Sequence, residues 1–144
     1  MRNALLVLGL LFPMLASASF TGNWTGSGGA NYAPGNSSDC RRVNFQFRQG
    51  FSTFDILRGE ALCGMNTFYF PTGTLTVQNG VLMDRGFAVG MIGADYFHIS
   101  YSPRAGVLNI LDVRLVGTTG MSVLHTSADN SRGTTEIRGD LSFQ

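Results

Sequence analysis

The sequence predicts an all-β protein, an antiparallel up-and-down β-barrel of about eight to ten strands, with a β-sandwich as the alternative. Many short segments alternate between apolar and polar residues, as strands with one buried face do. Glycine occurs 19 times and falls mainly at the ends of these segments, where turns are expected. No segment shows a sustained helical apolar period with caps, so little or no helix is expected.

The beginning of the chain predicts export. Arg2 supplies a positive charge, residues 4–15 are apolar but too short to span a bilayer as a helix, and residues 16–18 (ASA) form a small-x-small cleavage site. We therefore expect residues 1–18 to be a signal peptide, cleaved after Ala18, and residues 19–144 to be a single β-barrel domain. The mature protein is expected to be secreted or periplasmic, soluble, and without a transmembrane helix.

The first predicted strand, residues 20–28, has two unlike faces. Phe20 and Trp24, the only tryptophan, share one face with three glycines, and the other face is small and polar. Glycines on the aromatic face indicate positions where another backbone or side chain approaches closely. The last strand is also two-faced, and its predicted inward residues are Ile137, Gly139, Leu141 and Phe143. Since each end strand needs a partner, we expect the two to pair and close the barrel.

The two cysteines, Cys40 and Cys63, predict a disulfide bond because an exported chain with an even cysteine count most simply pairs them. No histidine is near either cysteine in the sequence, and the spacing is not C-x-x-C, which disfavours a metal or redox site. Residues 28–39 (GGANYAPGNSSD), which precede Cys40, are expected to form a surface loop.

The segments between the two ends predict the inner face of the barrel. VNFQFR, YFHISY and MSVLHTS alternate cleanly, and each segment places three residues on one strand face: Val43, Phe45 and Phe47; Phe97, Ile99 and Tyr101; and Met121, Val123 and His125. TLTVQ-NG-VLMD predicts a hairpin, because Asn79-Gly80 suits a type I′ turn with two positive φ angles. In VLNILDVRLVG, Asp112 and Arg114 are either an inward polar pair or part of the outward half of the strand. We favour the outward placement.

Gly22-Asn23-Trp24 on the first strand resembles the G-x-W signature of the calycin superfamily, which includes the lipocalin and avidin barrels. FTGNWT resembles an avidin first strand, and GNWTGSG is similar to the opening of nitrobindin-type haem barrels. The resemblance implies a barrel in which Trp24 packs across the closed bottom and the open end binds a small apolar ligand. Only Gly22 and Trp24 match by position, and their implied role is structural. Avidins surround biotin with several tryptophans, and nothing around His125 matches the haem-binding histidine of nitrobindins.

The sequence contains no motif for catalysis, metal binding or cofactor binding, so we expect a protein that is not an enzyme. His98 and His125 are the only histidines, which excludes a multi-histidine metal site. The acidic residues mostly lie on polar faces or beside turns, as solvated surface residues do. The formal net charge is +1 with scattered charges, which argues against nucleic acid as a partner.

Three functions suit such a chain. The first is binding of a small apolar ligand in the barrel, with a dry core as the equal alternative. The candidate lining is Trp24, Phe45, Phe47, Phe54, Ile56, Phe97, Ile99 and Tyr101. The second is a structural or protein-interaction role in the cell envelope, with an envelope protein as partner. The third is an eight-stranded outer-membrane barrel, which we disfavour because most predicted strands are shorter than the roughly 9–11 residues needed.

Overall fold

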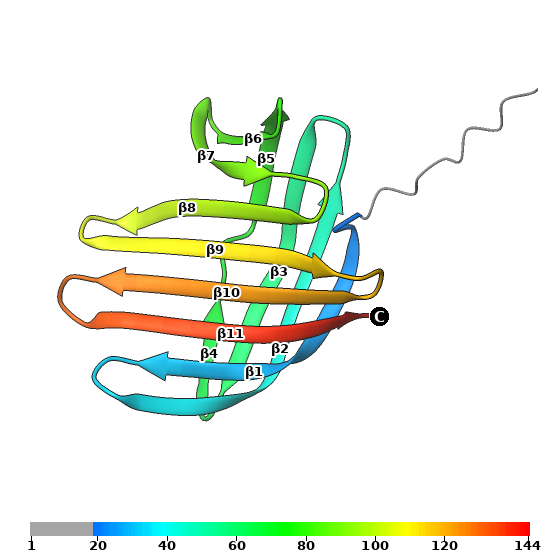
Figure 1. The fold of residues 1–144 in the computed structure, drawn as a ribbon. Helices are drawn as coiled ribbons and strands as arrows, with labels where there is room; N and C mark the ends of the chain where they lie inside the picture. Colours follow the sequence, from blue (N-terminus) through cyan, green and yellow to red (C-terminus); the bar gives the residue numbers. More distant parts are fainter. Residues whose placement is uncertain (1–18) are drawn as a thin grey trace, which may run out of the picture.

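The computed structural model describes residues 19–144, so the predicted signal peptide lies outside the described part of the chain. These residues form eleven β-strands and no helix (Figure 1). The strands are β1 (Gly22–Tyr32), β2 (Asn36–Gln49), β3 (Thr53–Cys63), β4 (Asn66–Tyr69), β5 (Gly73–Gln78), β6 (Val81–Asp84), β7 (Phe87–Ile92), β8 (Tyr96–Arg104), β9 (Val107–Val116), β10 (Gly120–Asp129) and β11 (Gly133–Phe143).

The strands form one antiparallel sheet that closes into a barrel, as predicted. Pairing runs from β1 through β11, β10, β9, β8, β7, β6 and β5 to β3, and β2 joins β3 to β1. Only β4 lies outside this ring, as a short strand on the edge of β3. Figure 1 shows β8 to β11 and β1 across the front, with β2, β3 and β5 behind them. The strand count exceeds the expected eight to ten because short pieces such as β4, with four residues, carry little alternation of their own.

The two end strands pair with each other, which confirms the predicted closure. β1 and β11 are in register from Trp24 opposite Phe143 to Tyr32 opposite Thr135. A side chain at Gly26 or Gly28 would run into the backbone of β11. The close approach that glycine was expected to permit is therefore the contact that closes the ring.

Trp24 is buried at the end of the barrel where β1 begins and β11 ends. Its indole N–H donates a hydrogen bond to the carbonyl oxygen of Phe20, with the two atoms 2.8 Å apart. Its ring meets the Phe143 ring edge-to-face, with centroids 5.3 Å apart. Phe143 is 48% exposed, so the prediction that it lies in the core is only partly right. At the last position of β11, Phe143 covers the rim of the barrel instead of filling its interior.

The apolar face of the strands points inward. The nine residues on these faces of VNFQFR, YFHISY and MSVLHTS are buried except Tyr101, which is partly buried. Asp112 and Arg114 lie on the outward half of β9, as favoured. Leu111, which precedes Asp112, and Val113, which lies between the two, are buried. The outer surface carries ion pairs, among them Arg58–Glu60 and Arg138–Glu136. The expectation that most strands are shorter than roughly 9–11 residues is wrong, because β1, β2, β3, β8, β9, β10 and β11 are each 9 to 14 residues long.

The predicted hairpin is present between β5 and β6. Asn79 and Gly80 have φ values of 51° and 78°, as a type I′ turn requires. Arg85 and Gly86 adopt the same conformation between β6 and β7, with φ values of 50° and 88°. The second turn carries arginine where asparagine or glycine is the usual residue, and no sequence motif indicated it.

The prediction of a surface loop over residues 28–39 is wrong. β1 continues to Tyr32 and β2 begins at Asn36, so only residues 33–35 form the turn. Gly28 to Tyr32 pair with β2 on one side and with β11 on the other. The segment is small and polar and shows no alternation, but two neighbouring strands satisfy its backbone, and this context overrides weak strand propensity.

The predicted disulfide joins Cys40 and Cys63, which stand directly opposite each other on β2 and β3. Both cysteines are buried in the core. The bond fixes the register of the outer ends of β2 and β3 next to the hairpin that leads to β4.

Replacing both cysteines with alanine is expected to lower the free energy of unfolding by about 3 kcal/mol. The bond closes a loop of 23 residues, and removing it restores conformational entropy to the unfolded chain. Urea unfolding of the wild type with and without reductant, beside the double variant, measures the effect. Equal midpoints for all three samples would show that the bond does not stabilise the barrel.

Candidate ligand pocket

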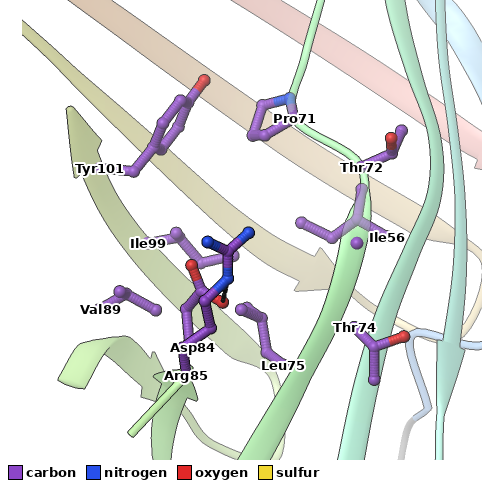
Figure 2. A pocket seen from close by; sticks show the side chains of 11 residues that line it. Ile56, Pro71, Thr72, Thr74, Leu75, Asp84, Arg85, Val89, Ile99 and Tyr101 are labelled. Carbon is purple, nitrogen blue, oxygen red and sulfur yellow. Dashed lines mark ion pairs between the residues drawn. The ribbon is translucent and has the colours of Figure 1, made fainter. Parts of the chain in front are cut away.

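A pocket of about 440 Å³ opens beside the β6–β7 turn, between β5 and β8 (Figure 2). It is lined by Ile56, Pro71, Thr72, Gly73, Thr74, Leu75, Asp84, Arg85, Val89, Ile99 and Tyr101. These residues come from β3, the β4–β5 connection, β5, the β6–β7 hairpin and β8. The volume lies in the range of small-molecule sites, and the lining combines an apolar wall with a few polar groups.

The apolar wall consists of Ile56, Leu75, Val89 and Ile99. Ile56 and Ile99 are inward residues of β3 and β8, and Leu75 alternates inward on β5. Val89 has no partner on β6, because the register shifts from Leu82–Gly90 to Met83–Ala88 around it. A bulge of this kind re-aims a side chain, and here the side chain faces the pocket (Figure 2).

Polar groups stand at the mouth of the pocket. Arg85 and Asp84 form a loose ion pair, with nitrogen and oxygen 3.8 Å apart, and Figure 2 shows both among the lining residues. The Thr74 hydroxyl donates to Asp55, which also accepts a hydrogen bond from Arg48. These two hydrogen bonds hold the pKa of Asp55 below its usual range, and the bond from Thr74 has the larger effect. Thr74 is therefore anchored by a carboxylate on the outer face of β3.

Tyr101 forms the end of the pocket away from Leu75 (Figure 2). Burial raises the pKa of its phenol to about 12, and a hydrogen bond with the Asn109 side chain opposes that shift. The phenol is therefore neutral at physiological pH and offers the pocket a hydroxyl group on an apolar ring.

The eight sequence-predicted lining residues occupy two places. Ile56, Ile99 and Tyr101 line the pocket. The other five belong to the buried core: Trp24, Phe45, Phe47, Phe54 and Phe97. The four phenylalanine rings pack on one another, with centroids 5.3 Å apart for Phe45–Phe47, 5.6 Å for Phe47–Phe54 and 4.8 Å for Phe54–Phe97. Sequence reasoning did not find Leu75, Val89 or Arg85, although inward alternation in TLTVQ was a usable signal for Leu75.

Two polar side chains point into the barrel among these apolar residues. Asn109 on β9 and His125 on β10 are each 8% exposed. Neither ring nitrogen of His125, nor Oδ1 of Asn109, has a hydrogen-bond partner among residues 19–144. The His125 ring meets Phe70 edge-to-face at 4.8 Å, and the residues paired with it are Leu111 and Ile137. Burial therefore lowers the pKa of His125 to about 4.

The buried His125 is expected to make the barrel less stable in mild acid. When the chain is unfolded, the ordinary pKa of 6.5 applies and His125 becomes protonated below pH 6.5. In the folded chain His125 stays neutral down to about pH 4. The contribution of neutral His125 to the free energy of unfolding is therefore present above pH 6.5 and is lost as the pH falls toward 4. We expect a loss of about 2 kcal/mol between pH 7 and pH 5.

Urea unfolding at pH 7 and pH 5, with H125L as the comparison, measures this effect. The leucine variant cannot take up the proton, so its free energy of unfolding should change less between the two pH values. Asp129, whose pKa is held low chiefly by hydrogen bonds from Ser131, stays ionised across this interval. An identical pH dependence in both proteins would contradict a buried neutral His125.

Residues 19–144 contain no group of three histidine, cysteine or acidic side chains placed to hold a metal ion. No helix within that range is long and apolar enough to cross a membrane.

Fold and pocket together define a small antiparallel β-barrel with an open pocket between β5 and β8, lined by both apolar and polar side chains. No protein-family model matches the sequence, and no curated protein matches it.

Solved structures share the fold. A protein of unknown function of the DUF3598 family from Nostoc punctiforme superposes with a TM-score of 0.61 and 10% identity, over 86% of this chain and 47% of that one. The chain thus spans about half of that protein. A second structure, EF1p2_mFAP2b bound to DFHBI, superposes with a TM-score of 0.50 and 12% identity, over 87% of this chain and 94% of that one. At these identities the likeness concerns the all-β fold.

Proposed function

We propose that this chain is an exported, calycin-type β-barrel that binds a small, largely apolar ligand in the pocket between β5 and β8, and that it acts by binding and not by catalysis. The signal-peptide pattern of residues 1–18 supports export, with the mature chain beginning at Ser19. Trp24 on a first strand that pairs with the last strand supports the calycin assignment.

The pocket itself is the observation that carries the proposal. Its aliphatic wall of Ile56, Leu75, Val89 and Ile99 offers an apolar ligand a surface on which to lose its hydration. The neighbouring phenylalanine rings of Phe47, Phe54 and Phe97 pack on one another in the buried core, so these three predicted lining residues do not line the pocket. EF1p2_mFAP2b, a protein with a similar fold, is bound to the small molecule DFHBI. Its binding of a small molecule supports the idea that a barrel of this kind can hold one.

V89W is expected to weaken binding of the neutral dye N-phenyl-1-naphthylamine at least about tenfold. The indole would occupy the volume that the dye needs, because Val89 points into the pocket. Dye fluorescence rises in an apolar site, so a fluorescence titration gives the dissociation constant directly.

M91W is the matched control, because Met91 lies two residues along β7, is 55% exposed and does not line the pocket. It should bind the dye as the wild type does. The proposal fails if the wild type does not bind the dye, or if V89W, with an unchanged far-UV circular dichroism spectrum, binds it equally well.

A further inference from the structure

Asn109 and His125 form a polar pair on the inner face of the barrel. Asn109 is opposite Ser127, and His125 is opposite Leu111, so the two side chains occupy diagonal positions on adjacent strands. Each is more than nine-tenths buried, and three of their polar atoms lack a partner among the described residues. Buried polar atoms are nearly always hydrogen-bonded, so an unpartnered set of three indicates that another group completes it.

This polar pair lies directly behind one wall of the pocket. Tyr101, which lines the pocket, is opposite Asn109 in the β8–β9 register. Phe70 contacts the His125 ring, and the next residue, Pro71, lines the pocket as well. The partly buried Tyr101 phenol, which hydrogen-bonds with the Asn109 side chain, stands between the pocket and the pair, so a ligand hydroxyl or amide would have to take its place.

The chemistry of the pair selects an uncharged partner. Asn109 Oδ1 accepts a hydrogen bond, and a neutral imidazole donates with one nitrogen and accepts with the other. A hydroxyl or amide group both donates and accepts, so it can satisfy them. Among residues 19–144 no cation pairs with His125, and the residues opposite it on the adjacent strands are Leu111 and Ile137. A carboxylate would be buried there without compensation and would face the Asn109 oxygen.

Resting on the proposed function, we propose that the ligand is an uncharged amphiphile: its apolar body occupies the pocket, and its hydroxyl or amide group hydrogen-bonds to Asn109 and His125. Arg85 at the mouth is the competing recognition element, since it would select an anion. The two alternatives differ in the charge of the ligand, which can be tested with probes of one shape.

The experiment measures displacement of N-phenyl-1-naphthylamine by naphthalene, 2-naphthol and 2-naphthoate at pH 7.5. 2-Naphthol is expected to bind about tenfold more tightly than naphthalene, and 2-naphthoate no more tightly than naphthalene. In N109L the advantage of 2-naphthol should disappear while naphthalene binding is kept. If N109L does not fold, the order of the three probes on the wild type decides.

Each other outcome is informative. Equal binding of naphthalene and 2-naphthol overturns this inference but leaves the proposed function intact. Tightest binding of 2-naphthoate, lost in R85A, overturns it in favour of anion recognition at the mouth. Failure of the dye and all three probes to bind overturns the proposed function as well.

Discussion

Alanine at Gly28 is expected to lower the free energy of unfolding by about 3 kcal/mol or more, whereas alanine at Gly29 should be neutral or stabilising by up to about 1 kcal/mol. The Cβ of an alanine at position 28 would overlap the carbonyl oxygen of Arg138, and its next contact would be Gly139 Cα at 2.8 Å. Both atoms belong to the β11 backbone, which cannot yield without losing its pairing with β1.

Gly29 provides a close control because it is the next residue on the same strand. Its added Cβ would find only the Ser38 oxygen, at an ordinary distance of 3.9 Å. Alanine there mainly restricts the unfolded chain, which is the source of the small expected gain. Urea unfolding followed by the fluorescence of Trp24, the only tryptophan, measures both variants. Similar stabilities for G28A and G29A would mean that β1 and β11 are not held as closely as described.

The parts of the fold that were predictable are those in which burial follows a local pattern. Alternation in VNFQFR placed Val43, Phe45 and Phe47 inside, and the structure buries all three. Asn79-Gly80 specified a turn type through its two positive φ angles alone. Pairing of the end strands followed from a different argument: the first and last strands each needed a neighbouring strand to pair with, and they could supply it to each other.

The features that were missed depend on neighbours distant in the sequence. Residues 28–39 show no alternation; residues 28–32 form a strand because β2 and β11 bond their backbone from either side, and residues 36–39 form one by pairing with β1. Val89 faces the pocket because of a bulge, which one strand's sequence does not specify. Alternation in MSVLHTS set His125 on the same face as Met121 and Val123, but its burial without hydrogen-bond partners depends on β9, β11 and Phe70 together.

Candidate binding residues were predictable only as inward aromatic and aliphatic positions. Period-two alternation tells which side chains face the interior, but not whether the interior there is filled. The structure divides them by depth: Phe47, Phe54 and Phe97 fill the core, and Ile99 and Tyr101 reach the pocket. That division depends on how β3, β5, the β6–β7 hairpin and β8 come together around the pocket, which is a property of the assembled barrel.

W24A is expected to cost about 3–5 kcal/mol of stability, among the largest effects of any single substitution in this chain. The indole is 3% exposed, it closes the end of the barrel where the first and last strands meet, and its ring packs against Phe143. Far-UV circular dichroism during urea unfolding replaces fluorescence here, because the variant has no tryptophan.

W24F separates the ring from its hydrogen bond. Phenylalanine keeps most of the apolar contact but leaves the buried Phe20 carbonyl without its donor, so we expect a loss of about 1–3 kcal/mol. W24F should also bind N-phenyl-1-naphthylamine as the wild type does, because Trp24 is not part of the pocket lining. A stable W24A would refute the closing role of the indole. A stable W24F with weakened dye binding would instead identify Trp24 as part of the binding site, because a residue that only closes the barrel affects binding through stability alone.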